Sequence, residues 1–193
     1  MNDLNPGTIF ITGLSASGKS TLGAQLRDNL VNQGIKNVRL LDGDEIRREL
    51  ARKGKEFGYS IQERHRVSIE IAYMALNYNR QGIICIVSSI CHVKTIREEM
   101  RSIVGNIIEV YLNCPVHMCA ARDYKGNYEK AFKGLLENFI GVDEPYQESD
   151  FVELVLHTGR DNIDDCSKVL LDTTITFLKS GQNAVPCTKI AGL

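Results

Sequence analysis

The sequence predicts an α/β fold: a five-stranded, mostly parallel sheet flanked by helices on both of its faces. Short apolar runs, rich in Ile, Val and Leu and without polar alternation, take turns with longer stretches of helical periodicity. Strands that helices cover on both faces have this continuous apolar character. A glycine-rich motif directly after the first apolar run is the second observation, and the length of 193 residues is the third. That length suits one domain with a sizeable core.

Each strand of this sheet is expected at one of the apolar runs. The runs are residues 8–12, 38–41, 83–87, 107–112 and 152–156. Consecutive parallel strands need a crossover connection, which is usually a helix. Helices are therefore expected over residues 19–33, 61–81, 94–104 and 116–122, and a last one over residues 162–178. Gly34 and Gly82 are suitable residues to end the first two of these helices.

Two segments interrupt the alternation and are candidate lids over a ligand site. They are residues 49–60, after the second strand, and residues 123–150, which are rich in charge, glycine and aromatic side chains. Ligands of parallel sheets bind beyond the carboxyl ends of the strands, where such connections lie. We expect a single domain over residues 1–179 with a lid around residues 123–150, and a flexible tail over residues 180–193.

The composition excludes several classes of partner. With 23 Lys and Arg against 24 Asp and Glu, the net charge is −1, so no global field attracts a nucleic acid polymer or a membrane. No stretch resembles a signal peptide or a membrane span. The six cysteines form no CxxC pair, which is typical of reduced, buried thiols. We expect a cytoplasmic protein that holds any anionic ligand in a local site.

The strongest motif is the glycine-rich loop between the first strand and the first helix. Its residues are Gly13, Leu14, Ser15, Ala16, Ser17, Gly18, Lys19 and Ser20, followed by Thr21. The glycines let backbone N–H groups face phosphates, and the amino terminus of the helix adds positive potential. Lys19 is expected to reach the β- and γ-phosphates, and Ser20 to offer its hydroxyl to the metal. The pattern predicts a P-loop NTPase that binds ATP, with Mg²⁺ as cofactor.

A GTPase is the main alternative to a kinase among P-loop proteins of this size. A GTPase would need an NKxD motif to read the base, and the sequence has none. Residues 123–126 fit DxxG, but they follow the wrong strand to sense a γ-phosphate. A small kinase therefore fits the motifs and the length better.

An acidic turn, Asp42-Gly43-Asp44, follows the second predicted strand. Because the carboxyl ends of parallel strands meet at one edge of the sheet, this turn is expected near the P-loop. Phosphoryl transfer needs a carboxylate that orients the attacking hydroxyl and helps to hold Mg²⁺. We assign Asp44 to that catalytic role and Asp42 to its support, with Lys19 as the third catalytic residue. Arg47, one helical turn beyond Asp44, is placed to bind an anionic part of the acceptor.

From about residue 8 to residue 156, the sequence resembles the adenylylsulfate kinase family. The matching pieces are Gly-Leu-Ser-x-Ser-Gly-Lys-Ser-Thr (13–21), Leu-Asp-Gly-Asp-x-x-Arg (41–47), Gly-Tyr-Ser (58–60), Glu-Arg (63–64), Arg-Asp-x-Lys-Gly-x-Tyr (122–128) and Asn-Phe-x-Gly-x-Asp-x-Pro-Tyr (138–146). The late block is uncommon and carries most of the specificity. Enzymes of this family use ATP to convert adenylylsulfate to 3′-phosphoadenylylsulfate.

The resemblance implies a set of binding residues. Tyr59 and Phe139 match the aromatic residues that stack on the two faces of the acceptor base. Arg47 and Arg64 match contacts to the anionic part of the acceptor. The lid over ATP is matched by Arg122 and Lys125. The full acceptor set that we expect is Asp42, Asp44, Arg47, Tyr59, Arg64, Ile90 and Phe139. Because members of the family often form dimers, a homodimer is a further expectation.

The sequence departs from the family pattern on the acceptor side. Where the family reads Asp-Arg-x-x-Asn-Ile-Arg-Arg, residues 63–70 read Glu-Arg-His-Arg-Val-Ser-Ile-Glu. Where it reads Ile-Ser-Pro-Tyr-Arg, residues 90–94 read Ile-Cys-His-Val-Lys, so a cysteine replaces the active-site serine. A lid lysine of the family is Glu137 here. Lys94 and Arg97 either face an acceptor phosphate or lie at the solvent-exposed start of a helix, and the sequence favours neither interpretation.

We interpret the chain as an ATP-dependent kinase that phosphorylates the 3′-hydroxyl of adenylylsulfate, with a divergent acceptor site. One alternative is a related kinase for another nucleotide-activated group, such as cytidine diphosphoramidate. A second alternative is a non-catalytic module that binds ATP, which the intact Lys19, Ser20 and Asp44 disfavour. The expected partner of the kinase is a small nucleotide-like acceptor.

Overall fold

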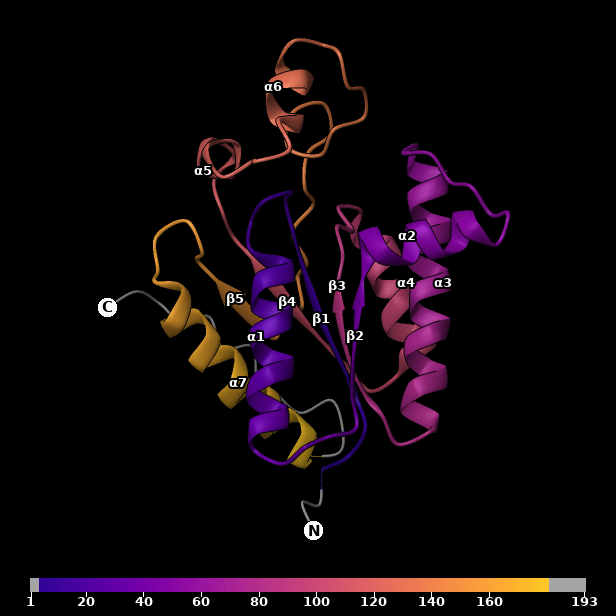
Figure 1. Cartoon of the computed structure of the whole chain (residues 1–193), viewed down its shortest axis with the longest axis vertical. Coiled ribbons are helices and arrows are strands. Elements are labelled where there is room, and N and C mark those ends of the chain that lie inside the picture. Colours follow the sequence, from indigo (N-terminus) through magenta and orange to yellow (C-terminus); the bar gives the residue numbers. More distant parts are fainter. Residues whose placement is uncertain (1–3, 181–193) are drawn as a thin grey trace.

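The computed structural model describes residues 4–180, which contain one sheet of five strands. The strands are β1 (Thr8–Gly13), β2 (Val38–Asp42), β3 (Ile84–Ser88), β4 (Ile107–Leu112) and β5 (Leu154–Leu156), in the spatial order β2-β3-β1-β4-β5 (Figure 1). Every pairing is parallel, so the predicted fold class is confirmed. β1 lies in the middle, and the loop after it emerges where successive strands are added on opposite sides.

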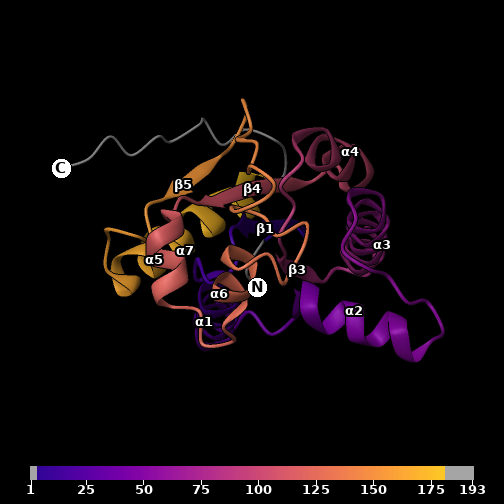
Figure 2. The same cartoon turned by 90° about the horizontal axis from the view of Figure 1, so that it is seen from above.

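Helices cover both faces of the sheet. They are α1 (Lys19–Asn32), α2 (Gly43–Arg52), α3 (Ile61–Arg80), α4 (Lys94–Val104), α5 (Val116–Ala121), α6 (Asn127–Phe132) and α7 (Ile163–Ser180). The neighbouring helices α1 and α7 lie on one face, and α3 and α4 lie together on the other (Figure 1). The short helices α5 and α6 lie beyond the carboxyl ends of the strands, and the view from above places α6 over the sheet (Figure 2).

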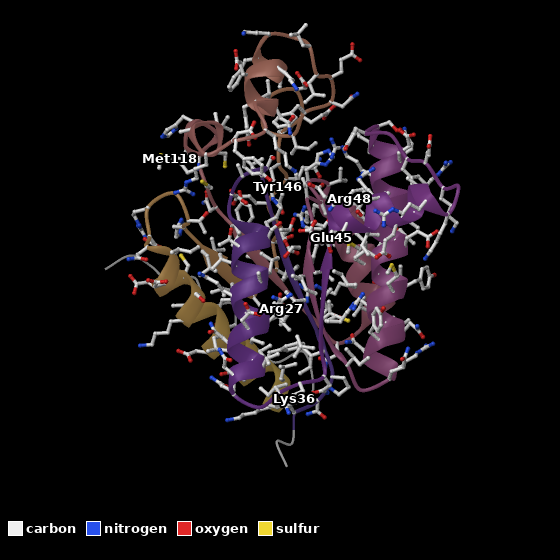
Figure 3. All side chains as sticks on the ribbon, viewed as in Figure 1. Arg27, Lys36, Glu45, Arg48, Met118 and Tyr146 are labelled. Atoms are coloured by element: carbon white, nitrogen blue, oxygen red, sulfur yellow. The ribbon has the colours of Figure 1, made fainter. Side chains whose placement is uncertain are left out.

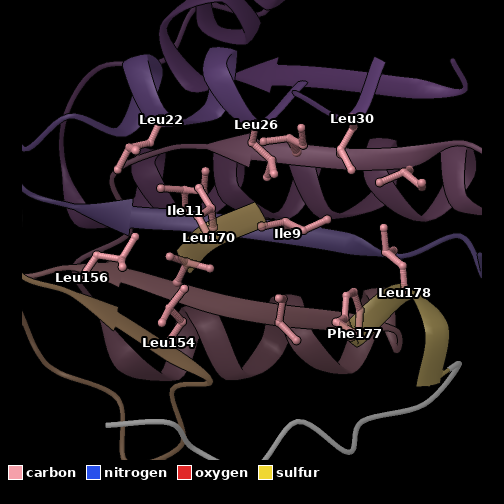
Figure 4. Close-up of a cluster of buried hydrophobic side chains, with 14 of the residues drawn as sticks. Ile9, Ile11, Leu22, Leu26, Leu30, Leu154, Leu156, Leu170, Phe177 and Leu178 are labelled. Carbon is pink, nitrogen blue, oxygen red and sulfur yellow. The ribbon is translucent and has the colours of Figure 1, made fainter. Parts of the chain in front are cut away.

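Two layers of buried apolar side chains fill the space between the sheet and the helices. On the α1/α7 face, Leu22, Leu26 and Leu30 pack with Ile9 and Ile11 of β1 (Figure 4). Their spacing of four residues places the three leucines on one stripe of α1. The layer on the other face includes Phe10, Ile46, Val67, Ile71, Val87 and Met100. The core therefore fixes the start of α1 relative to the ends of the strands, where the predicted site lies.

Most elements follow the sequence prediction, and three differ from it. β4 and α4 have the predicted bounds, whereas β5 begins at Leu154 and not at residue 152. α2 begins directly at the acidic turn, capped by Asp42, and buries Ile46 and Leu50. It therefore includes residues 49–52, the first part of the candidate lid segment 49–60. α6 lies inside the segment 123–150, where the sequence predicts no helix.

The predicted tail begins at residue 180, and residues 181–193 lie outside the described part of the chain. Within residues 4–180, no helix combines the length and the apolar character needed to cross a bilayer. The cysteines of these residues are Cys85, Cys91, Cys114, Cys119 and Cys166, all of them free and buried.

Candidate active site

The loop between β1 and α1 owes its shape to residues with positive φ. These are Gly13 (148°), Ala16 (56°) and Gly18 (102°). Gly13 also passes close to β4, since a Cβ on this residue would lie 2.8 Å from the carbonyl oxygen of Leu112. Ala16 adopts a left-handed conformation without being glycine, and such local strain is typical of functional loops. The predicted P-loop therefore curls tightly, at the carboxyl end of the central strand.

The amino terminus of α1 is open toward this loop. Gly18 precedes the helix, no side chain caps the helix there, and its first turn carries no acidic residue. The first N–H groups of a helix have no partner within it, so they can bind an anion. The buried hydroxyl of Ser17 also lacks a hydrogen-bond partner among residues 4–180. These features fit the phosphate groups of ATP.

Lys19 lies folded back onto the loop. Its buried ammonium donates a hydrogen bond of 2.6 Å to the carbonyl oxygen of Leu14. Burial lowers the pKa of Lys19 to about 8, and the negative charges of Asp44 and Asp42 limit the decrease. Lys19 is therefore mostly charged at neutral pH, in a place where water does not screen that charge.

Asp42 joins the P-loop to the acidic turn. The hydroxyl of Ser20 donates to Oδ2 of Asp42 at 2.7 Å. The other carboxylate oxygen, Oδ1, accepts hydrogen bonds from the backbone N–H groups of Asp44 at 3.0 Å and Glu45 at 3.4 Å, which caps α2. Mg²⁺ prefers oxygen ligands and takes one or two carboxylates beside phosphate oxygens. The hydroxyl of Ser20 and the carboxylates of Asp42 and Asp44 form a donor set that fits this ion.

Asp44 faces the lid across the mouth of the site. Its Oδ2 lies 3.1 Å from Nζ of Lys125, in the loop between α5 and α6. The hydrogen bond with Asp44 raises the pKa of Lys125. Because 68% of the Asp44 side chain and 46% of the Lys125 side chain are exposed, water weakens this ion pair. A phosphate group can therefore replace the carboxylate as the partner of Lys125.

Two arginines lie close to the ring of Tyr59. The guanidinium carbon of Arg47 is 4.8 Å from the ring centre, and that of Arg64 is 5.1 Å from it. Arg47 donates to the carbonyl oxygen of Gly58 at 2.9 Å, and Arg64 donates to that of Tyr59 at 2.9 Å. Tyr59 itself is 55% exposed. An open aromatic ring beside two guanidinium groups is suited to a ligand that is both aromatic and anionic.

The loop that carries Tyr59 is held by the start of α3. Ser60 and Glu63 form a capping box. The carboxylate of Glu63 also accepts a hydrogen bond of 2.8 Å from the N–H group of Gly58. Hydrogen bonds from Ser60 and Gly58 lower the pKa of Glu63, so it stays ionised at neutral pH. Glu63 therefore holds the loop that carries Tyr59 against the start of α3.

Phe139 packs within the lid. Its ring meets the ring of Tyr128 edge-on, with 4.8 Å between the centroids. The hydroxyl of Tyr128 donates to the carbonyl oxygen of Ser15 at 3.1 Å, so the lid touches the P-loop. Ile90 packs against the same lid cluster from the loop after β3. Phe139 and Ile90 thus pack against the same cluster, whereas Tyr59 is linked to the lid through Arg64.

Two arginine side chains, Arg64 and Arg122, each donate to a backbone carbonyl group of a distant segment. Arg64, beside Tyr59, donates to the carbonyl oxygen of Asn138 at 3.1 Å. Arg122 donates to the carbonyl oxygen of Thr158 at 2.9 Å, and the hydroxyl of Thr158 donates to the carbonyl oxygen of Ser17 at 2.8 Å. Arg122 therefore supports the P-loop in this structure. Thr158 belongs to no motif, so the sequence gives no signal for its contact.

Where the sequence departs from the family pattern, the changed side chains contact one another or a neighbour. Sγ of Cys91 lies 3.8 Å from Oγ of Ser68, and both residues are buried. Burial raises the pKa of Cys91 to about 11, so its thiol is protonated and a poor nucleophile. The carboxylate of Glu70 pairs with Lys55 at 2.7 Å. The negative charge that replaces a family arginine is therefore compensated locally.

His92 lies in the changed loop between β3 and α4 and is 3% exposed. Its Nε2 has no hydrogen-bond partner in the described part of the chain. Burial, and then the nearby charge of Arg64, lower the pKa of His92, so the ring is neutral at pH 7.

Both sequence interpretations of Arg97 are wrong. The side chain is only 2% exposed and lies 2.9 Å from Glu109, so it faces neither solvent nor an open acceptor site. Lys94 instead pairs with Asp150. The sequence holds a signal for Arg97: Glu109 stands inside the apolar run 107–112, and a buried carboxylate needs a cationic partner.

Comparisons with known proteins point to one family. The family model described as Adenylylsulphate kinase matches residues 5–157. The adenylyl-sulfate kinase of Synechococcus sp. (strain JA-3-3Ab) is 36% identical over 166 residues, which cover 86% of this chain and 92% of that protein. The adenylyl-sulfate kinase of Thermodesulfovibrio yellowstonii is 39% identical over 165 residues, covering 84% and 80%. The structure of the Mycobacterium tuberculosis APS kinase in complex with AMPPNP and APS has a TM-score of 0.79 and 29% identity, covering 88% and 98%.

Proposed function

The chain belongs to the adenylylsulphate kinase family, and on that premise we propose that it transfers the γ-phosphate of ATP to the 3′-hydroxyl of adenylylsulfate. The products are 3′-phosphoadenylylsulfate and ADP, and the reaction belongs to sulfate assimilation. The observation that carries the proposal is the joining of the two halves of the site. Ser20 of the P-loop contacts Asp42 at 2.7 Å, and Asp44 follows at the same edge of the sheet.

The donor half of the mechanism rests on residues 13–21. The curled backbone and the uncapped start of α1 hold the phosphates by their N–H groups. When ATP binds, the ammonium group of Lys19 leaves the carbonyl oxygen of Leu14 and pairs with the phosphates, where its charge stabilises the phosphoryl group in transfer. Ser20 and Asp42 would hold Mg²⁺, and the bound ion would neutralise phosphate charge. Lys125 leaves Asp44 and contacts the phosphates from the lid side.

The acceptor half positions the hydroxyl. The base of adenylylsulfate stacks on Tyr59 and Phe139, and Arg47 and Arg64 bind its anionic part. Asp44 orients the 3′-hydroxyl and accepts its proton as the new oxygen–phosphorus bond forms. The bond between the γ-phosphorus and the bridging oxygen breaks at the same stage, and ADP leaves with that oxygen.

The test is a measurement of ATP turnover with Mg²⁺ and either adenylylsulfate or a cytidine diphosphate compound at matched concentrations. We expect ADP and 3′-phosphoadenylylsulfate to form in equal amounts with adenylylsulfate. Turnover with the cytidine compound alone would assign the changed loop 90–94 to a different acceptor. ATP binding without ADP formation under any condition would support a non-catalytic module.

Two further expectations belong to this proposal. A cytoplasmic location agrees with the free, buried cysteines of the described residues, and cell fractionation tests it. A homodimer is expected from the family, and light scattering after gel filtration tests it.

A further inference from the structure

The lid returns to the sheet through residues 146–149, which we call the strap. The ring of Tyr146 stacks on that of Tyr111 with 4.9 Å between the centroids. Its hydroxyl lies 3.0 Å from Oγ1 of Thr12, at the carboxyl end of β1. Figure 3 shows Tyr146 below the lid, at the upper end of the sheet. The strap therefore anchors the lid at the edge where phosphate transfer takes place.

The strap also contacts the loop that precedes α4. The N–H group of Gln147 donates to the carbonyl oxygen of His92 at 2.9 Å. The side-chain oxygen of Gln147 accepts a hydrogen bond of 3.0 Å from the N–H group of Lys94, and no side chain of the residue before α4 caps this helix. Gln147 thus caps α4 from a distant part of the chain. Gln147 therefore joins the strap both to residues 89–93, which we call the acceptor loop, and to the first residue of α4.

Arg97 lies beneath both segments. Nη1 donates to the carbonyl oxygen of Cys91 at 2.6 Å, in the acceptor loop. Nη2 donates to the carbonyl oxygen of Gln147 and, at 2.9 Å, to Oγ of Ser149, in the strap. Nε lies 2.9 Å from Oε1 of Glu109 on β4, and the guanidinium lies 5.0 Å from the ring centre of Tyr146. The buried guanidinium group of Arg97 therefore contacts the acceptor loop, the strap and the sheet.

We propose that Arg97 is a positioning residue that holds the acceptor loop and the strap as one unit, so that the lid is in place only when the acceptor side is formed. The inference rests on the proposed function for its chemistry. Because Arg97 is only 2% exposed, it does not contact a substrate directly, so it acts through Cys91 and Gln147. Arg97 reaches these two carbonyl groups from separate nitrogens, Nη1 and Nη2, and the single nitrogen of an ammonium group does not reproduce this spacing.

The consequence for the reaction is the exclusion of water. When the lid and the acceptor loop are fixed together, the γ-phosphate meets the acceptor hydroxyl in a closed site. When they move separately, acceptor binding weakens and water competes for the phosphate. Loss of Arg97 should therefore change acceptor use far more than ATP binding, since within residues 4–180 no hydrogen bond of this side chain goes to the P-loop.

The test compares Arg97→Lys with Arg101→Lys. Arg101 lies one turn later on α4 and pairs with Glu153 at 2.7 Å, outside the strap and the acceptor loop. We expect Arg97→Lys to raise the KM for adenylylsulfate about tenfold, to leave the KM for ATP within about twofold, and to increase ATP hydrolysis per transfer. Arg101→Lys should leave all three quantities at the wild-type level. Equal effects of the two substitutions, or none from Arg97→Lys, would overturn the proposal.

A milder variant guards against a general loss of folding. Ser149→Ala removes the hydroxyl that accepts from Arg97 and donates to Glu109 at 2.7 Å, and it keeps the buried ion pair. We expect the same changes in acceptor use, at about a third of the size on a logarithmic scale. A Ser149→Ala enzyme with unchanged KM values and an unchanged ratio of hydrolysis to transfer would contradict the role of the strap.

Hydrogen–deuterium exchange separates this inference from the proposed function, because it needs no acceptor. In Arg97→Lys, residues 89–93 and 146–149 should exchange faster together, while residues 13–21 keep their wild-type rates. If the wild-type enzyme fails to phosphorylate adenylylsulfate, the proposed function falls and the exchange result alone decides the inference. Faster exchange in only one of the two segments would show that Arg97 does not join them.

Discussion

The donor side and the acceptor side of this site are built in different ways. The donor side is one continuous loop, residues 13–21, between a strand and the helix that follows it. The acceptor side gathers residues from the start of α2, the loop before α3, the loop after β3 and the lid. Its segments are held together by arginine side chains that donate to backbone carbonyl oxygens, as Arg47, Arg64 and Arg97 do.

The difference explains where sequence change is tolerated. A continuous phosphate loop depends on specific residues at fixed spacing, because each backbone N–H group must face the ligand. An assembled surface can exchange side chains as long as its carbonyl–arginine links remain. The replaced residues here fit that view: Ser68 contacts Cys91, and Glu70 pairs with Lys55. The donor chemistry can thus stay constant while the acceptor surface changes.

Removal of the central cation of the donor side should have the largest effect. We expect Lys19→Met to lower kcat/KM about 10³-fold, since its charge stabilises the transferring phosphoryl group. The control is Lys36→Met, on an exposed lysine at the opposite end of the molecule from Tyr146 (Figure 3). Steady-state kinetics with both substrates measures the effect, and equal activity of the two variants would contradict the assignment.

Asp44 lies between the two sides, and its loss should be the next largest effect. Asp44→Asn keeps the shape of the side chain but removes the proton acceptor, so we expect kcat to fall about 10²-fold. The neighbouring Glu45→Gln, also on the exposed start of α2 (Figure 3), should retain wild-type kcat. A wild-type turnover of Asp44→Asn in the same assay would remove Asp44 from the mechanism.

Arg64→Lys should affect the acceptor side alone. Arg64 donates to the carbonyl oxygens of Tyr59 and Asn138 from two separate nitrogens, Nε and Nη2, and a lysine has one nitrogen in place of this fork. We therefore expect the KM for adenylylsulfate to rise about tenfold with an unchanged KM for ATP. Arg66→Lys, on an exposed arginine of the same helix, is the matched control. A parallel rise of both KM values would mean that the two sides are not independent.

The pH dependence of ATP use should reveal the buried lysine of the donor side. Below its pKa of about 8, Lys19 carries a positive charge, and above it the charge is lost. We therefore expect kcat/KM for ATP to fall several-fold as the pH rises through this value, with a smaller change in the KM for adenylylsulfate. Initial rates from pH 6.5 to 9.5 measure both; a flat profile for ATP would show that Lys19 stays charged.

Cys91→Ser should have the smallest effect, although it restores the residue type of the family. The thiol is buried and its pKa is raised to about 11 by burial, so no step of the proposed mechanism uses it. We expect kcat/KM within about twofold of the wild-type value. Alkylation of the folded protein with iodoacetamide at pH 7.5, followed by mass spectrometry, should leave Cys91 unmodified.

The sequence predicts the parts of the molecule that depend on neighbours in the chain. The P-loop, the strand before it and the helix after it follow from the spacing of glycines and apolar residues. β4 and α4 have their predicted bounds because their apolar runs end at polar or glycine residues. α2 is not among the predicted helices, because its buried apolar stripe consists of only two residues, Ile46 and Leu50, and directly follows the acidic turn.

The contacts that remain hidden join residues far apart in the chain. Glu109 inside an apolar run indicates that a buried cation is needed, but not which one; only the fold shows that Arg97 lies beside Glu109 and Ser149. Thr158 supports the P-loop at Ser17 from beyond β5, with no motif around it. Tyr59 and Phe139 are known from resemblance alone, since their spacing in the sequence carries no geometric information.

The uncapped amino terminus of α1 has a consequence beyond catalysis. A bound triphosphate supplies the missing cap, so part of what holds the folded chain together comes from its substrate. A ligand that binds only the folded state adds about 2.7 kcal/mol to the free energy of unfolding at 100 times its Kd. Without bound nucleotide this contribution is absent, so the ATP-free protein should unfold more often, and be cleaved by proteases faster, than the ATP-bound protein.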